Sequence, residues 1–248
     1  MKQPEKKKRK IFGYYYSQEF INNKYHHLLM VLIFLFLFAP ILDSFNITIS
    51  FSGLIFFLSI IFTLRVVIEE KKILYSISSL TALAFITIVL VRYRVISGKT
   101  YIPLLVIAIT IFIICLLYSI WILMKRLLTE KKIKVDTIEG GICIYILIGL
   151  AWALLYYLTH ILDKSAFMIR DSLIVDFKAF EYYSFTILTT LGLGDIIPVS
   201  RIAISLTTIE AVIGQMFVAV FIARLISVYV REKVNDDEEE DEAISSNS

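Results

Sequence analysis

Long apolar runs without charged residues constrain the fold of this chain more than any other feature. A bilayer-spanning helix needs about 18–20 consecutive apolar residues, and 58% of the 248 residues are hydrophobic. Six runs reach or approach that length, at residues 28–42, 44–64, 73–91, 100–124, 140–162 and 202–223. The first run is the shortest, and the last is interrupted only by Glu210. These runs predict an all-α integral membrane protein with six transmembrane helices.

The 25 Lys and Arg residues gather at alternate ends of the predicted spans. Most of them lie before residue 28, at residues 65–72, at residues 125–134, or after residue 223. Cytoplasmic loops carry the excess of basic residues, so we expect a multi-pass protein of the plasma membrane with both termini in the cytoplasm. The basic N-terminal run is expected to contact anionic membrane lipids. No nucleic-acid partner is expected, because the basic residues lie at membrane edges.

The connection between the fifth and sixth predicted spans, residues 163–201, is longer than two neighbouring helices require. Within it, residues 176–188 are rich in aromatic and aliphatic side chains but too few to cross a bilayer. They predict a short re-entrant helix. Irregular backbone at membrane depth is tolerated where it is buried in protein or lines a water-filled path. The residues that follow this helix are therefore predicted to face a pore.

Glycine occupies every second position in the loop that follows, between Thr190 and Asp195. Backbone that alternates between positive and negative φ can aim successive carbonyl groups to one side, and Gly192 and Gly194 permit this alternation. The two leucine side chains of the loop are then expected to pack behind it. The expected K⁺ ligands are the carbonyl groups of Thr190, Leu191, Gly192 and Leu193, together with the Thr190 hydroxyl. One chain supplies one wall of such a column, so four copies are needed to replace the hydration shell of the ion.

The segment from Thr190 to Asp195 resembles the Thr-Val-Gly-Tyr-Gly-Asp signature of the tetrameric potassium channels, and the resemblance extends over residues 138–230. It implies a homotetramer in which the re-entrant pore helix and the filter lie between helices five and six. The implied selectivity filter consists of Thr190, Leu191, Gly192, Leu193, Gly194 and Asp195. K⁺ is then the permeant ion, and no cofactor is implied.

The pore helix of that family carries an aromatic pair, which residues 182–186 match. The implied filter-support residues are Tyr182, Tyr183, Thr186 and Thr189. The sequence departs from the family at Leu193, where the family has Tyr or Phe, and this loss of a ring contact to the tyrosine pair favours weaker selection of K⁺ over Na⁺. Thr186 stands where some members have a carboxylate that bonds to the filter Asp. Asp195 must therefore find another partner or stay hydrated.

These elements divide the chain into a basic cytoplasmic N-terminus, a four-helix membrane domain, a pore domain with outer and inner helices, and an acidic tail. The corresponding ranges are residues 1–26, 27–134, 135–231 and 232–248. The tail is predicted to be disordered, because residues 236–242 are all Asp or Glu. The four-helix domain is not expected to sense voltage, because residues 100–124 contain no Lys or Arg. A separate regulatory subunit is one expected source of control.

Two residues of the last span are candidates for gating. Glu210 lies near mid-depth, where an ionised side chain costs roughly 2.5–3.5 kcal/mol. It is either a proton- or ion-sensitive group or a carboxyl hydrogen-bonded to the pore helix. Gly214 matches the inner-helix hinge glycine of the family and is either a hinge or a close-packing position. His160, at the outer end of the fifth span, is expected to be an interfacial residue.

A potassium-selective channel subunit is the function that these features favour. The alternatives are a weakly selective monovalent cation channel, which Leu193 motivates, and a non-conducting regulatory membrane subunit. An enzyme is not expected, because the loops contain neither a nucleophile with its base nor a metal-binding cluster.

Overall fold

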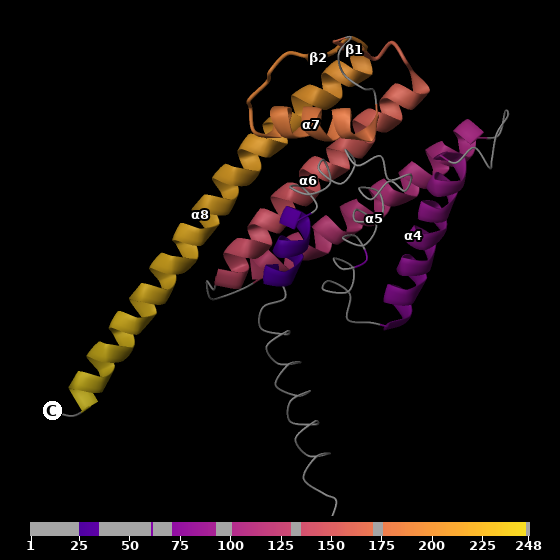
Figure 1. Ribbon diagram of the computed structural model, residues 1–248. Helices are drawn as coiled ribbons and strands as arrows, with labels where there is room; N and C mark the ends of the chain where they lie inside the picture. Colours follow the sequence, from indigo (N-terminus) through magenta and orange to yellow (C-terminus); the bar gives the residue numbers. More distant parts are fainter. Residues whose placement is uncertain are drawn as a thin grey trace, which may run out of the picture.

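The computed structural model describes residues 25–34, 61, 71–92, 101–129, 135–170 and 176–246. A short helix, Tyr25–Phe34, comes first. The elements that follow are α4 (Lys71–Arg92), α5 (Tyr101–Thr129), α6 (Val135–Leu162), β1 (Phe167–Ile169), α7 (Phe177–Leu188), β2 (Ile196–Pro198) and α8 (Arg201–Ser246). Figure 1 shows α4, α5 and α6 side by side, with the short α7 between α6 and α8 near one end of the bundle.

Four described helices are long and apolar enough to cross a membrane. These segments are Leu74–Val91, Tyr101–Thr129, Val135–Leu162 and Arg201–Arg231. They confirm the last four of the six predicted spans, and the chain is a membrane protein. The predicted span at residues 44–64 lies outside the described residues except for residue 61, and only the first part of the span at residues 28–42 is described, within Tyr25–Phe34.

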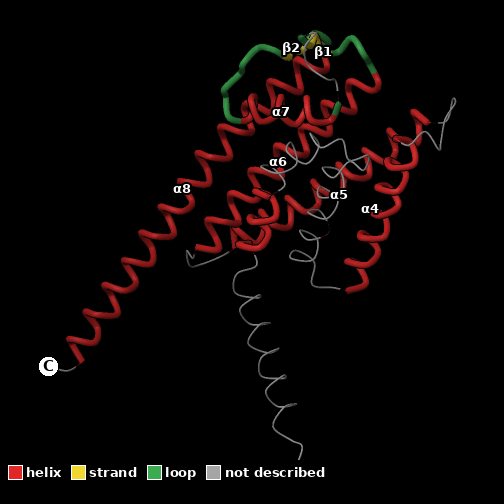
Figure 2. Tube along the Cα trace, viewed as in Figure 1, coloured by secondary structure: helices red, strands yellow, loops and turns green. Residues whose placement is uncertain are grey.

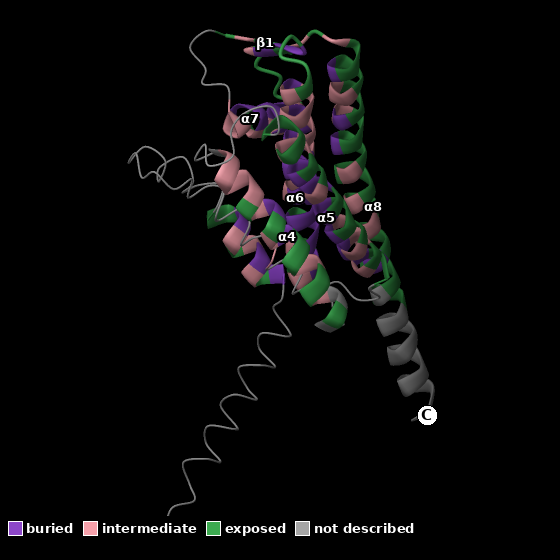
Figure 3. Ribbon diagram, turned by 90° about the vertical axis from the view of Figure 1, so that its right-hand side faces the viewer, coloured by how far each residue is buried: buried purple, intermediate pink, exposed green. Residues whose placement is uncertain are grey.

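The helices pack unevenly on one another. Buried side chains gather where α5 and α6 meet, and they include Ile109, Leu116, Ile144 and Leu147 (Figure 3). In the most apolar part of α6, 56% of the residues are buried, whereas in the most apolar part of α8 only 11% are buried. Most of the apolar surface of α8 is therefore exposed in the single chain.

The N-terminal helix is attached to the beginning of α6. The backbone N–H of Tyr25 donates to Asp136 Oδ1 at 3.0 Å, and His26 Nδ1 lies 2.8 Å from Glu139 Oε1. The Tyr25 ring lies against Gly140, where an added Cβ would come within 3.2 Å of a ring carbon. These contacts connect a segment from the start of the chain to the helix that leads into α7.

A two-stranded antiparallel sheet closes the end of the molecule near α7. Phe167 pairs with Pro198, and Ile169 pairs with Ile196. The carbonyl oxygen of Ala166 accepts hydrogen bonds from the backbone N–H groups of the two residues that follow β2. The sheet therefore connects the chain leaving α6 to the chain entering α8, on either side of α7.

The structure differs from the disordered tail expected over residues 232–248. Helix α8 continues without a break to Ser246 (Figure 2). No Gly or Pro follows Gly214 in this helix, and the glutamates of the acidic segment have good helix propensity. The long apolar helix before them also supplies the nucleus that an isolated acidic peptide would lack.

Candidate functional site

Helix α7 has the limits that the sequence predicts for the pore helix. Asp176 caps its first turn, because Oδ1 accepts from the backbone N–H groups of Lys178 at 3.0 Å and Ala179 at 3.2 Å. At its other end, Thr189 donates to the carbonyl oxygen of Phe185 through its backbone N–H and, at 2.6 Å, through Oγ1. Local hydrogen bonds thus define both ends of α7, and Thr189 braces the end from which the loop departs.

The loop after α7 has the alternating backbone that its glycines permit. Positive φ occurs at Thr190 (61°), Gly192 (53°) and Gly194 (75°), and not at Leu191 or Leu193. A Cβ added at either glycine would meet no atom within 4 Å, so it is the dihedral angle that calls for glycine at these positions. Thr190 is the only non-glycine residue with positive φ among the described residues, which is unfavourable for a β-branched side chain.

The hydrogen bonds of this loop leave its carbonyl groups available. Two of its N–H groups are engaged: Thr190 N donates to Ile187 O at 2.9 Å, and Gly192 N donates to Thr186 O at 3.0 Å. In the described part of the chain, no donor binds the four carbonyl groups expected to be K⁺ ligands, those of Thr190, Leu191, Gly192 and Leu193. The Thr190 hydroxyl donates to Thr189 O at 2.6 Å, so its oxygen keeps acceptor capacity.

The leucine side chains of the loop are not covered within one chain. Leu191 is 62% exposed and Leu193 is 57% exposed, although both are expected to pack behind the loop. A neighbouring chain is needed to cover them if that packing forms.

Asp195 has the partner that the sequence leaves open. Tyr182 Oη donates to Asp195 Oδ2 at 2.7 Å, and Oδ1 accepts from the backbone N–H of Ile196 at 3.1 Å. The Asp195 carbonyl oxygen accepts from the backbone N–H of Arg170 at 3.2 Å. The hydrogen bond to the carboxylate raises the pKa of the Tyr182 hydroxyl. Tyr182 therefore connects the middle of α7 to the last residue of the loop.

We predict that Tyr182→Phe loosens the Asp195 end of the loop. The lost hydrogen bond is partly exposed, so its contribution should be about 0.5–1.5 kcal/mol. If the loop binds K⁺, the rise in melting temperature on exchanging NaCl for KCl should be smaller in the variant. The matched control is Tyr118→Phe, which removes a hydroxyl from α5, and an equal loss in both variants would contradict the assignment.

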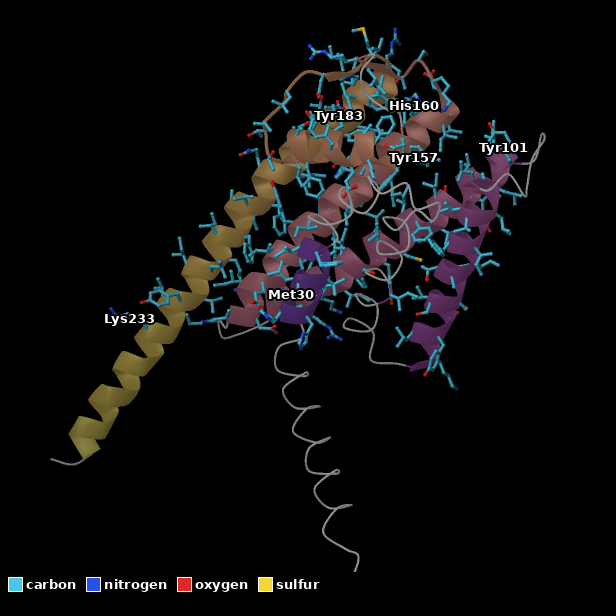
Figure 4. The ribbon with its side chains drawn as sticks, viewed as in Figure 1. Met30, Tyr101, Tyr157, His160, Tyr183 and Lys233 are labelled. Carbon is cyan, nitrogen blue, oxygen red and sulfur yellow. The ribbon has the colours of Figure 1, made fainter. Side chains whose placement is uncertain are left out.

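The other tyrosine of the pair lies elsewhere. Tyr183 is buried, its ring lies 5.0 Å from that of Tyr156, and its Oη lies 2.9 Å from Thr207 Oγ1 (Figure 4). Tyr183, on α7, thus packs against α6 and α8, whereas Tyr182 contacts Asp195. Thr186 is buried and donates to the Tyr183 carbonyl oxygen at 2.7 Å, while its own carbonyl oxygen holds Gly192.

Glu210 is completely buried and bonded to two hydroxyl groups. Tyr156 Oη lies 2.5 Å from Glu210 Oε2, and Ser184 Oγ lies 2.5 Å from Oε1. The Glu210 carboxyl, on α8, is therefore hydrogen-bonded to α7 of its own chain, as one of the two sequence interpretations expects. Tyr156 and Ser184 were not predicted. The sequence does indicate that a buried carboxyl needs polar partners such as hydroxyl groups. It does not indicate which of the many hydroxyl residues these partners are.

Gly214 provides space for the end of α7. A Cβ added there would lie 2.6 Å from the carbonyl oxygen of Leu188, the last residue of that helix. The same oxygen accepts from Tyr145 Oη at 3.0 Å. This contact supports the close-packing interpretation of Gly214. Helices α6 and α8 together hold Leu188, two positions before Thr190.

Two glycines of α6 allow similarly close contacts. An added Cβ at Gly149 would come within 2.8 Å of the Phe185 ring of α7, and one at Gly141 within 2.1 Å of the Phe221 ring of α8. Small residues at helix contacts let membrane helices approach closely.

His160, expected at the interface, is buried at the end of α6. The centroid of its ring lies 5.2 Å from that of the Phe180 ring (Figure 4).

Glu181 on α7 gives the site a titratable group outside the membrane-spanning helices. Burial raises the pKa of its carboxyl to about 7, and Lys178 partly offsets this effect. The folded protein therefore holds a proton that the unfolded chain releases near pH 4.5. The resulting destabilisation is absent below about pH 4.5 and complete above about pH 7.

We predict that Glu181→Gln stabilises the protein in a pH-dependent manner. Its melting temperature in detergent should exceed that of the wild type at about pH 8, and the difference should shrink toward about pH 4.5. A difference that stays constant across this range would show that Glu181 titrates normally.

The comparisons with known proteins give one result. Residues 142–231, from α6 to α8, match a family described as Ion channel. No curated protein and no solved structure matches the chain. The matched segment contains the candidate loop, α7, and the residues that brace them. Within the described residues, no group of three or more His, Cys, Asp or Glu side chains is placed to hold a metal ion.

Proposed function

We infer that this chain, whose residues 142–231 match the family described as Ion channel, is one subunit of a potassium-selective channel with Thr190–Asp195 as its filter. The alternating φ of that loop carries the inference. Residues 190, 192 and 194 have positive φ, and the carbonyl groups expected to be K⁺ ligands receive no hydrogen bond from the described residues. Unbonded carbonyl oxygens in a row can replace the water around a dehydrated cation.

A homotetramer is the assembly that we propose. A single loop presents oxygens from one side, whereas a K⁺ ion without its hydration shell needs them from all sides. The exposed apolar surface of α8 and the exposed leucines of the loop supply surface for neighbouring copies to cover. Closed rings of identical subunits are the common solution for such surfaces.

The proposed location is the plasma membrane, with both termini in the cytoplasm and α7 entering from the outside as a re-entrant pore helix. The charge distribution supports this orientation. The described helices α4 and α5 carry Lys and Arg only near their ends, so we do not expect the channel to sense voltage directly. A separate subunit could supply regulation.

K⁺ flux out of liposomes tests the proposed function. Purified protein, whose measured mass shows whether it is a tetramer, would be reconstituted with K⁺ inside and Na⁺ outside. K⁺ efflux that depends on the protein is expected, with a reversal potential in planar bilayers close to that of K⁺. A reversal potential near zero under opposed K⁺ and Na⁺ gradients would favour the weakly selective cation channel. Absence of flux from intact tetramers would favour the non-conducting subunit.

A further inference from the structure

We propose that Glu210 is a neutral carboxylic acid that relays hydrogen bonds between α6, α7 and α8, and that Tyr156 and Ser184 are positioning residues for the filter. The proposal deepens the proposed function and rests on it for the role of the filter. Its starting point is the set of contacts around one carboxyl group, none of which lies in the loop itself.

The number of protons in this cluster decides the state of the carboxyl. Ser184 Oγ lies 2.8 Å from the carbonyl oxygen of Gly149 and 2.5 Å from Glu210 Oε1, but a serine hydroxyl has one proton to donate. For both short contacts to be hydrogen bonds, the serine proton must go to the Gly149 oxygen, which can only accept. Oε1 and the serine oxygen then need a proton from elsewhere, and Tyr156 has already given its own to Oε2.

A proton on Glu210 satisfies all three contacts at once. Oε1–H donates to Ser184 Oγ, Ser184 Oγ–H donates to Gly149 O, and Tyr156 Oη–H donates to Glu210 Oε2. Each group then has a defined donor or acceptor role, as buried polar groups require. An ionised carboxylate would leave either the Ser184–Gly149 contact or the Ser184–Glu210 contact without a hydrogen.

The surroundings of Glu210 agree with a neutral group. Its side chain is fully buried in a membrane-spanning helix, where a charge is expensive unless it is paired. Glu210 forms no ion pair with any Lys, Arg or His that the structure describes. A carboxyl that keeps its proton avoids the desolvation of an ion and still accepts and donates hydrogen bonds.

The relay holds α7 against both neighbouring helices. Ser184 lies in the middle of α7, six residues before Thr190, and its partners come from α6 and α8. Serine and tyrosine hydroxyl groups therefore set the position of α7 along α8 before the filter begins. Loss of the relay should displace the filter oxygens and reduce selection of K⁺ over Na⁺, beyond any general loss of stability.

Four variants separate a neutral acid from a carboxylate. Glu210→Gln keeps an acceptor oxygen and supplies N–H donors in place of the O–H donor, so it should retain K⁺ flux within about twofold and leave the reversal potential unchanged. Glu210→Ala, Tyr156→Phe and Ser184→Ala each leave a buried group without a partner and should lower the ratio of K⁺ to Na⁺ permeability by roughly three- to tenfold. The matched control is Ser119→Ala, because Ser119 is buried in α5 and bonds only to its own helix. If Glu210→Gln impairs selectivity as much as Glu210→Ala, the neutral acid is excluded.

Infrared spectroscopy of the tetramer tests the proton directly and does not depend on conduction. At neutral pH, subtracting the Glu210→Gln spectrum from that of the wild type should leave the C=O stretching band of a protonated carboxyl, shifted in D₂O. A carboxylate band in its place would overturn the proposal. If the wild type conducts no K⁺ but shows the protonated band, the proposed function fails while the assignment of Glu210 stands.

Discussion

Replacing Gly192 with alanine should abolish the proposed selectivity for K⁺. The φ of 53° at this position places an L-residue in the left-handed region, at about 1–2 kcal/mol. The space around the absent Cβ is open, so this cost comes from the backbone and not from a clash. In the proposed tetramer it is incurred four times, roughly 4–8 kcal/mol in total. We expect the loop to leave the alternating conformation, and the reversal potential under opposed K⁺ and Na⁺ gradients to move toward zero.

The neighbouring residue provides the control for this experiment. Leu191 lies in the same loop without positive φ, so Leu191→Ala removes a side chain without straining the backbone. It should reduce flux less than Gly192→Ala and should keep the preference for K⁺. Equal effects of the two substitutions would mean that the loop depends on side-chain packing, and the argument from the backbone would then fail.

Much of the loop was predictable because glycine leaves a direct mark in a sequence. The spacing of Gly192 and Gly194 predicted the positive φ that both residues have. The positive φ of Thr190 was not predicted, because threonine normally avoids that region. Helix α7 was predictable at both ends, since its apolar run has the length of a short helix and begins beside an aspartate that caps it.

The contacts that brace α7 could not be predicted in the same way. Glu210 binds Tyr156 and Ser184, which lie 54 and 26 residues away in the sequence. No local pattern fixes which hydroxyl meets a carboxyl across three helices. The same holds for Tyr182, because its contact with Asp195 depends on how the loop between them folds back toward α7. The prediction of a disordered acidic tail differs from the structure for another reason. Composition predicts disorder, but helix α8, which forms before the acidic residues, continues through them.

Replacing Gly214 with alanine should displace the end of α7 and impair both stability and conduction. The new Cβ would lie 2.6 Å from the Leu188 carbonyl oxygen and 3.0 Å from Leu188 Cδ1. The side-chain carbon can move by rotation, but the carbonyl oxygen belongs to the backbone and also binds Tyr145 Oη. Overpacking of this kind costs about 1–3 kcal/mol. Thermal unfolding in detergent and K⁺ flux from liposomes should therefore both decline.

A displaced glycine distinguishes packing from hinge bending at this position. In the double variant Gly214→Ala/Gln215→Gly, α8 regains a flexible residue next to the original one, but the space opposite Leu188 O stays filled. If the contact with α7 decides, the double variant should remain as impaired as Gly214→Ala alone, because a glycine at residue 215 relieves no overlap. Recovery of both opening rates and flux would instead identify Gly214 as a hinge. A melting temperature unchanged by Gly214→Ala would point the same way, since a helix that merely bends less loses no packing.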